Sequence, residues 1–344
     1  MQTEISSAPS FPPSEVVRRS ESAGLHAGAP LSRMVPPARA MLLAADDLRG
    51  AEKRLTALVG SRVEVVAAIG AYLTEAGGKR LRPMLAALGA RAVGLDGDIS
   101  GLMCVGELIH LGSLLHDDVV DEGLERRGRA TAHRVYGNAA VILTGDFCLA
   151  RAVLLAGEEG GHRAVTELGA AVTAMAEGEV LQLQRAGNLT TTLEEYLEMV
   201  DKKSATLIAW CAAAGAWARN DEVAAQALVS FGRGVGVAFQ ITDDVLDYSS
   251  ATGKTPGQDL RERKLTLPLV YAMQRIPDLR ERLAGNPDIP ALVEEIRASG
   301  ALEDALADAR RRADRAIAAL SVLPPSDYRD ALVELGAYLV ERAV

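Results

Sequence analysis

The chain has 344 residues, enough for one large domain or two domains of ordinary size. Hydrophobic residues make up 49% of it and aromatic residues only 4%, so a large core can form, built mostly from aliphatic side chains. The net charge of −9 argues against a nucleic-acid-binding surface, and the three cysteines, which form no Cys-x-x-Cys pair, are typical of buried thiols in a reducing compartment.

The first segment, residues 1–38, is rich in proline and serine and has no hydrophobic periodicity. Such a composition cannot bury enough apolar surface to fold, so we expect a disordered leader. It lacks the charged-then-apolar order of a secretory signal, which favours a cytoplasmic protein.

From residue 39 to 344 the hydrophobic pattern is helical almost throughout. Glycine-containing breaks separate the helices, and no convincing alternating strand or interdomain linker interrupts them. The longest apolar run, Leu207 to Ala218, is too short to cross a bilayer and predicts a core helix, so we expect no transmembrane segment. The sequence predicts one all-α domain, a large helical bundle. The expected helices are 40–59, 61–75, 81–94, 99–120, 137–157, 162–186, 203–219 and 222–248, with several more towards the end.

A basic segment, Gly77-Gly78-Lys79-Arg80-Leu81-Arg82-Pro83, precedes the helix expected at 81–94. The Gly-Gly pair allows backbone amides to approach an anion, and the Lys and Arg side chains supply positive charge. A basic loop at a helix start, without a ligand, is the alternative interpretation.

An acidic motif, Asp-Asp-x-x-Asp, occurs twice, at 117–121 and at 243–247, each time within an apolar helical pattern. Residues four apart share a helix face, so Asp117 projects with Asp121, and Asp243 projects with Asp247. Carboxylates gathered in this way need compensating charge, and Mg²⁺ prefers a few carboxylates together with phosphate oxygens. A single copy would equally suit a solvated helix end. Two copies predict two acidic helices that face each other across a metal–diphosphate site.

Two further segments carry positive charge beside these motifs. Arg126-Arg127-Gly128-Arg129 closely follows the first motif, and arginine forks suit bidentate phosphate contacts. A local ion-pair network with Glu122 and Glu125 is the alternative. The second motif is followed by a Gly/Pro-containing segment, 253–268, with Lys254 and Lys264. It could close over an anion, or it could be a charged surface loop.

Together these motifs resemble the trans-prenyl diphosphate synthase family, whose members elongate isoprenoid chains head to tail. The resemblance extends from about Leu73 to Pro268. It rests on GGKRLRP at 77–83, IHLGSLLHDDVVDEG at 109–123, RRGR at 126–129, GDF at 145–147, EGEVLQL at 177–183, DKKSA at 201–205, FQITDDVLD at 239–247 and GQDLRERKLTLP at 257–268.

The resemblance implies an isoprenoid-synthase fold with a central cavity, two substrates and a role for each matching residue. Isopentenyl diphosphate would be held by Lys79, Arg82, His110 and Arg127. The allylic diphosphate would be held by Arg126, Lys203, Ser204, Gln240, Lys254 and Lys264, with Gln240 and Ser204 near the developing cation. Three Mg²⁺ would be bound by Asp117, Asp121 and Asp243, with Asp118, Asp244 and Asp247 as supporting carboxylates.

The chemistry implied by the resemblance is ionisation of an allylic diphosphate, attack by the double bond of isopentenyl diphosphate, and loss of a proton. Cations and metal ions aimed at the leaving diphosphate would stabilise charge where it develops. No general base is obvious. His116, next to the first motif, is better interpreted as a structural hydrogen-bonding residue.

Small residues before the first motif bear on product length. Ser113 and Gly112 lie four and five positions before Asp117, where bulky groups stop chain growth in the family. Both are small here, so the tail would pass towards Leu108 and Ile109, which favours a long product of about six to ten isoprene units.

Three alternatives share part of this pattern. A terpene cyclase would have the first acidic motif, but the second Asp-Asp-x-x-Asp and the basic 77–83 segment would not be expected. A non-catalytic subunit of a heteromeric synthase usually lacks the metal carboxylates, and a purely structural bundle would leave them unexplained.

The resemblance further implies a homodimer and allows peripheral membrane contact during product release. Arg263 and Glu125 depart from the family, where glycine or an apolar residue is more common.

Overall fold

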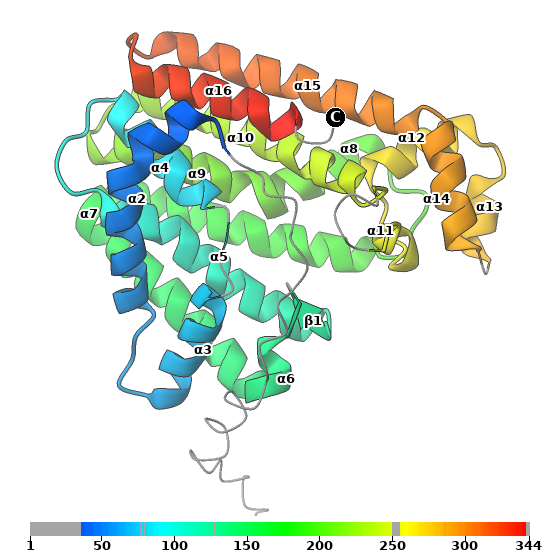
Figure 1. The fold of residues 1–344 in the computed structure, drawn as a ribbon, viewed down its shortest axis with the longest axis horizontal. Helices are drawn as coiled ribbons and strands as arrows, with labels where there is room; N and C mark the ends of the chain where they lie inside the picture. The colour runs from blue at the N-terminus through cyan, green and yellow to red at the C-terminus, as the bar shows by residue number, and fades with distance from the viewer. Residues whose placement is uncertain are drawn as a thin grey trace, which may run out of the picture. The chain divides into compact units, whose positions relative to one another are not determined.

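The computed structural model describes residues 36–75, 78, 80–126, 128–249, 255–285 and 287–341 (Figure 1). Nearly all of the predicted leader lies outside these residues, as do Lys79, Arg127 and Lys254. The described chain divides into two compact units. Unit 1 comprises Lys53–Gly78 and Leu108–Arg151, and unit 2 comprises the described parts of Ala29–Glu52, Lys79–Glu107 and Ala152–Val344.

Unit 1 carries the first acidic motif and the arginine segment that follows it. Its elements are the end of α2 (Ala38–Leu58), α3 (Glu64–Glu75), the second part of α5 (Ser100–Val120), β1 (Glu125–Arg126), β2 (Arg129–Ala130), α6 (Ala132–Tyr136) and the start of α7 (Asn138–Arg185). The two strands pair antiparallel, with Glu125 opposite Ala130 and Arg126 opposite Arg129. Strands of two residues are too short to give an alternating pattern, which is why the sequence did not predict this hairpin.

Unit 2 is entirely helical among the described residues. It holds the remaining parts of α2, α5 and α7, and then α4 (Leu81–Ala92), α8 (Leu193–Val200), a π-helical turn η1 (Asp201–Ala205), α9 (Thr206–Ala218), α10 (Glu222–Leu246), α11 (Gln258–Arg261), α12 (Leu267–Arg275), α13 (Leu279–Ala284), α14 (Ile289–Ala298), α15 (Ala301–Ala319), η3 (Leu320–Val322) and α16 (Asp327–Glu341).

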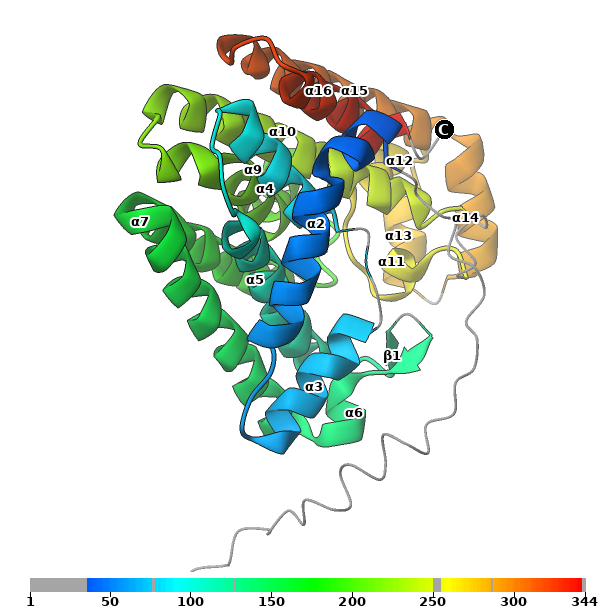
Figure 2. The same ribbon diagram turned by 60° about the vertical axis from the view of Figure 1, so that its left-hand side comes forward.

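Helix α9 lies at the centre of unit 2, with every residue from Thr206 to Trp217 buried. It packs against α4 on one side and α10 on another, while α15 runs along α10 and α16 runs along α15 (Figures 1 and 2). Small residues make the central contacts possible: a side chain at Gly215 would collide with the backbone of Ala90 on α4. The Ala-rich run therefore forms the predicted core helix.

Helix α7 contains a break at Gly161, whose φ of 75° and ψ of −172° are not helical. The sequence predicted a break at this Gly-Gly pair, because only glycine adopts such a conformation without steric cost. Among the described residues α7 is also the one helix long and apolar enough to cross a membrane by length and composition, with 39% of its most apolar window buried. Core helices of soluble proteins meet the same two criteria.

The predicted fold class is confirmed. Up to α10, the longer helices begin and end within a few residues of the expected ranges, where helical periodicity and glycine breaks are clearest. The short helices α6 and α8 were not predicted. The π-helical turn η1 at 201–205 also differs, because the sequence merged it with the following helix.

Candidate active site

The first acidic motif lies at the C-terminal end of α5. Asp117 and Asp118 are in its last turn, and Asp121 follows the helix with its N–H donating to the Asp117 carbonyl at 2.8 Å. Asp118 is only 3% exposed, whereas Asp117 is half-buried and Asp121 is exposed. The first and third carboxylates are thus accessible to a ligand, while the middle one is turned into the protein.

The arginine hairpin β1–β2 contacts α5 and α3 through side chains and one backbone carbonyl. Arg126 Nε donates to Asp118 Oδ1 at 2.7 Å. The guanidinium of Arg129 lies 4.1 Å from the centroid of the Tyr72 ring, and the Tyr72 hydroxyl donates to the Ala130 carbonyl at 2.6 Å. Arg126, expected to contact a diphosphate, is therefore held by the buried acid in this structure.

His116 hydrogen-bonds to α7, as expected of a structural residue. Its Nε2 lies 3.1 Å from the Ile142 carbonyl and 3.4 Å from a carboxylate oxygen of Asp146. A side chain at Gly145 would overlap the His116 ring, so the glycine of the Gly-Asp-Phe motif makes room for it. This contact fixes the turn of α5 that carries Asp117.

Gly112 and Ser113 are placed differently on α5. A Cβ at Gly112 would lie 3.0 Å from the Gly145 carbonyl oxygen and 3.4 Å from the Leu149 side chain, so Gly112 packs closely against α7. Ser113 is half-buried, and its hydroxyl donates to the carbonyl of His110 at 3.0 Å. The predicted effect of these two residues on product length stays a prediction.

Arg80, just before α4, forms a largely buried ion pair. Arg80 has a φ of 49°, in the left-handed region, and its Nη1 donates to Glu107 Oε2 at 3.1 Å, while its Nε lies 3.4 Å from Glu52. Glu107 is buried, so this pair is largely shielded from water. Arg82 follows in the first turn of α4, and its Nε is buried without a hydrogen-bond partner among the described residues. An anion would satisfy that donor, in keeping with its predicted role.

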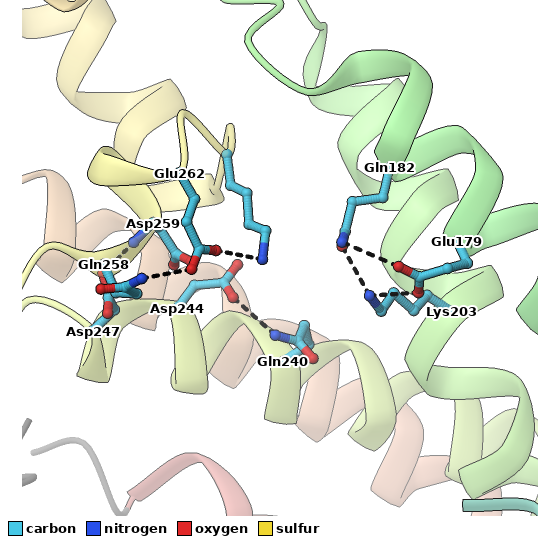
Figure 3. A network of polar contacts seen from close by, with 10 residues as sticks. Glu179, Gln182, Lys203, Gln240, Asp244, Asp247, Gln258, Asp259 and Glu262 are labelled. Carbon is cyan, nitrogen blue, oxygen red and sulfur yellow. Dashed lines mark hydrogen bonds and ion pairs between the residues drawn. The ribbon is translucent and has the colours of Figure 1, made fainter. Parts of the chain in front are cut away.

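The second acidic motif, at the end of α10 in unit 2, repeats the arrangement of the first. Asp244 is buried, whereas Asp243 and Asp247 are half-buried. Asp247 accepts a hydrogen bond from the backbone N–H of Asp259 at 3.0 Å, which joins the motif to α11 (Figure 3). The two motifs belong to different units, and their facing each other stays a prediction.

The middle carboxylate of this motif is held by two donors. The Tyr196 hydroxyl, on α8, donates to Asp244 Oδ2 at 2.5 Å, and Gln240 Nε2 donates to Asp244 Oδ1 at 2.9 Å. The Ser204 hydroxyl in turn donates to Gln240 Oε1 at 3.0 Å. Tyr196 is fully buried, and its burial, together with the adjacent Asp244, raises the pKa of its hydroxyl well above the usual value.

The carboxylates around the second motif repel one another. Burial, reinforced by Asp243 and Asp247, raises the pKa of Asp244 to about 7. Burial and the neighbouring Asp244 and Asp247 raise the pKa of Asp259 to about 8. Such a cluster favours a bound cation, because a positive ion would stabilise the ionised forms.

The donor chemistry around both motifs is that of a hard divalent cation. Among the described residues no group of three His, Cys, Asp or Glu side chains is arranged to hold a metal by itself. Mg²⁺ commonly takes only one or two carboxylates and completes its octahedron with water and phosphate oxygens. The accessible carboxylates of each motif fit that role.

Lys203 projects from the π-helical turn η1 towards α7. Its Nζ lies 2.5 Å from Glu179 Oε2 and donates to Gln182 Oε1 at 3.1 Å (Figure 3). Gly178 permits this approach, since a Cβ there would lie 2.6 Å from the Lys203 backbone nitrogen. π-Turns of this kind are frequent at functional sites. Lys264, beyond α11, is paired with Glu262 at 2.6 Å.

A cavity of about 200 Å³ in unit 2 gathers these side chains. Five residues predicted from the sequence line it together: Lys203, Ser204, Gln240, Asp244 and Lys264. Residues from α7, α8, α11 and the connections next to these helices complete its wall: Gln182, Arg185, Ala186, Thr191, Tyr196, Met199, Val200, Asp259, Leu265 and Thr266. Five predicted residues from three separate sequence motifs therefore meet at one cavity.

The family profile described as Polyprenyl synthetase matches residues 63–296. The chain belongs to the polyprenyl synthetase family. It is 39% identical over 318 residues to octaprenyl diphosphate synthase of Escherichia coli (strain K12), covering 87% of this chain and 97% of that protein. It is 35% identical over 310 residues to the all-trans-nonaprenyl-diphosphate synthase (geranyl-diphosphate specific) of Rhodobacter capsulatus, covering 87% and 95%.

The structural comparison agrees. A polyprenyl synthase from Caulobacter crescentus CB15, solved with calcium and isoprenyl diphosphate, superposes with a TM-score of 0.84 at 38% identity. The match covers 92% of this chain and all of that one. The recognition of the family from sequence motifs is thus confirmed.

Residues that motif matching missed complete the polyprenyl synthetase cavity. Asp259 lies inside the quoted GQDL segment, and Glu179 and Gln182 lie inside EGEVLQL, yet none was assigned a role. Tyr196 lies on α8, outside every helix and every motif that the sequence predicted, so no local signal marked it.

Proposed function

We propose that this protein is a Mg²⁺-dependent trans-polyprenyl diphosphate synthase. It condenses isopentenyl diphosphate with an allylic diphosphate of the geranyl or farnesyl type and releases diphosphate. The observation that carries this proposal is the convergence of Lys203, Ser204, Gln240, Asp244 and Lys264 on one cavity beside an Asp-Asp-x-x-Asp motif. Family membership supports the same activity, since the relatives named above are long-chain prenyl diphosphate synthases.

The two lysines of the cavity are suited to holding the allylic diphosphate. In the described structure each is paired with a glutamate, Lys203 with Glu179 and Lys264 with Glu262. Both lysines are roughly one-third exposed, so a highly charged diphosphate can compete for them as the stronger anion. Lys254 and Arg126 are proposed to contribute further contacts.

The reaction begins when the bond between C1 of the allylic substrate and its diphosphate oxygen breaks heterolytically. The electron pair leaves with the diphosphate, and the allylic fragment becomes a delocalised cation. The double bond of isopentenyl diphosphate then attacks C1, and a proton is lost to the departing diphosphate. Bound Mg²⁺ would supply charge neutralisation for the leaving group.

The chain's own residues prepare each of these steps. Asp117, Asp121 and Asp243 are proposed to hold three Mg²⁺, and Asp118, Asp244 and Asp247 to support them. Arg82, with its unpaired buried N–H, is proposed to bind isopentenyl diphosphate together with Lys79, His110 and Arg127. The Gln240 carbonyl oxygen provides a negative dipole end near the position of the cation.

The finer features of the proposal concern product and assembly. We propose a product of about six to ten isoprene units, or about 30 to 50 carbons, from the small residues Gly112 and Ser113. Residues 39–344 are proposed to form the catalytic domain of a cytoplasmic homodimer, with peripheral membrane contact during release of the apolar product.

A product assay tests the activity. Purified protein, Mg²⁺ and labelled isopentenyl diphosphate are incubated with dimethylallyl, geranyl, farnesyl or geranylgeranyl diphosphate, and the chains are sized. We expect Mg²⁺-dependent elongation that EDTA abolishes and Mg²⁺ restores. Asp117→Ala and Asp243→Ala should each remove nearly all turnover, while Asp314→Asn, an exposed acid on α15, should not.

Two outcomes would overturn the proposal. Failure of the label to enter a longer chain with any primer would favour a cyclase or a non-catalytic subunit. Full activity in EDTA, or in both aspartate variants, would remove the metal from the mechanism.

A further inference from the structure

A buried tyrosine lies at one end of a continuous chain of hydrogen bonds that reaches the cavity. The chain runs from Tyr196 on α8, through Asp244 and Gln240 on α10, to Ser204 in η1. Figure 3 shows the contact in the middle of this chain, between Gln240 and Asp244. The sequence analysis assigned Tyr196 no role.

The chain determines which way the Gln240 side-chain amide points. Its NH₂ group donates to Asp244 at 2.9 Å, and its oxygen accepts from the Ser204 hydroxyl at 3.0 Å. A rotation of 180° would place the amide oxygen against a carboxylate oxygen and the NH₂ group beside Ser204. The rotated form loses both hydrogen bonds and adds repulsion with Asp244.

Tyr196 keeps Asp244 in the position that imposes this choice. Tyr196 is 1% exposed and Asp244 is 6% exposed, so water cannot readily replace their contact. Without the Tyr196 hydroxyl, Asp244 Oδ2 would lose its donor in a buried setting. The carboxylate could then rotate and release Gln240.

We propose that Tyr196 is a positioning residue, which acts through Asp244 to keep the Gln240 amide oxygen directed towards Ser204 and the reacting allylic group. This inference rests on the proposed function. An amide oxygen stabilises an adjacent carbocation, whereas an amide NH₂ group, the positive end of the dipole, raises the energy of that cation. The orientation of one amide therefore changes the rate of ionisation more than the binding of either substrate.

The first experiment compares two fully buried tyrosines. Tyr196→Phe removes the hydroxyl that donates to Asp244. Tyr248→Phe is the control, because Tyr248 is also fully buried but its hydroxyl donates to neither Asp244 nor Gln240. We expect Tyr196→Phe to lower kcat about tenfold, with KM for both substrates within about twofold, and Tyr248→Phe to leave kcat unchanged. Equal kcat values for the two variants would overturn the inference.

A double-mutant cycle tests whether Tyr196 and Ser204 act through the same amide. Ser204→Ala removes the partner of the Gln240 oxygen at the other end of the chain. If both residues orient Gln240, the kcat of the double variant should lie within about twofold of the kcat of the slower single variant. Losses that multiply, about a hundredfold for two tenfold effects, would show independent roles and overturn the inference.

A third measurement does not depend on turnover. The side-chain NH₂ signals of Gln240 are followed by NMR in protein labelled at glutamine nitrogen, with Gln240→Glu identifying them by their loss. Tyr196→Phe, or Ser204→Ala if the first variant fails to fold, should shift these signals and speed their exchange with water, while Tyr248→Phe should not. Unchanged signals in both variants would overturn the inference. Absence of elongation by the unaltered enzyme would instead refute the proposed function, and the NMR result would still decide the role of Tyr196.

Discussion

The guanidinium of Arg126 donates a hydrogen bond to the buried carboxylate of Asp118 at 2.7 Å. Asp118 is the middle acid of the first acidic motif, and Asp244, the middle acid of the second, is likewise buried and held by Tyr196 and Gln240. Each motif thus directs two carboxylates to the accessible side and uses the third to fix a neighbouring polar group. The repeated spacing has a structural meaning beyond metal binding.

Replacing Asp118 should therefore act through Arg126. Asp118→Asn keeps an acceptor for the arginine but removes the negative charge, and a hydrogen bond to a charged partner contributes about 1.5–3 kcal/mol. We expect kcat/KM for the allylic substrate to fall about 10- to 100-fold, while Asp117→Ala loses nearly all activity. Steady-state kinetics with each substrate varied separately measures the effect.

The matched comparison is Arg126→Lys, which keeps the positive charge but loses the planar fork. If Asp118 works by orienting Arg126, this variant and Asp118→Asn should show the same selective loss for the allylic substrate. An Asp118→Asn enzyme with wild-type kinetics would contradict the role given to the pair.

The carboxylate cluster of the second motif predicts opposite effects of pH with and without metal. The pKa values of Asp244 and Asp259, raised by burial to about 7 and about 8, exceed the value of about 3.9 for an unfolded aspartate. Between these values the folded chain binds more protons than the unfolded chain. The free energy of unfolding of the metal-free protein should therefore fall as the pH rises from about 5.5 to about 8.

Metal binding reverses this trend because Mg²⁺ and diphosphate together favour the ionised carboxylates. The increase in Tm on adding both should grow as the pH rises, and thermal melts in EDTA and in Mg²⁺ with diphosphate measure it. Asp259→Asn should flatten the pH dependence of the metal-free protein. A Tm in EDTA that rises steadily over this range would contradict the assignment.

Arg263 occupies a backbone conformation that favours glycine. Its φ is 53°, and its carbonyl accepts a hydrogen bond from Gly187 N–H at 3.2 Å, immediately before Lys264. The left-handed conformation costs a residue with a Cβ about 1–2 kcal/mol. Glycine would adopt this conformation without that cost.

Substitutions at Arg263 should separate backbone strain from side-chain function. Arg263→Gly should stabilise the protein by about 0.5 kcal/mol, since relief of strain is partly offset by the greater flexibility of glycine in the unfolded chain. Arg263→Val should destabilise the protein by about 1–2 kcal/mol, because a β-branched residue disfavours this conformation. It should also weaken binding of the allylic substrate, because the adjacent Lys264 would be displaced. Urea unfolding and KM measure the two effects. A stabilised valine variant would contradict the argument.

The sequence predicted the longer helices and five residues of the cavity, because helices follow local patterns and these residues belong to recognisable motifs. Helical periodicity with glycine breaks located the longer helices up to α10, and motif residues such as Lys203 and Gln240 line one cavity. Tyr196 could not be found in this way. Its role depends on a contact with Asp244, 48 residues away, and tyrosine on a buried helix face is ordinarily only a core residue.

Product length offers a case in which the structure refines the expectation. Gly112 and Ser113 were treated alike in the sequence, but a Cβ at Gly112 would press on the Gly145 carbonyl of α7, whereas Ser113 is half-buried. Gly112→Phe would therefore disturb helix packing together with any effect on the growing chain. Ser113, one helical turn before Asp117 on the same face, is the better position for a test.

Ser113→Phe should shorten the product by about two isoprene units or more while leaving the first condensation within about threefold of the wild-type rate, because the ring would occupy space one turn of about 5.4 Å from Asp117. Gly112→Ala is the packing control: it should lower the free energy of unfolding by about 1–3 kcal/mol without changing the length distribution. Chain sizing by chromatography after incubation with farnesyl diphosphate measures the first, and urea unfolding the second. Products of unchanged length from a folded Ser113→Phe enzyme would show that the tail does not pass this face of α5. If Gly112→Ala shortens the product and Ser113→Phe does not, length control belongs to the contact between α5 and α7.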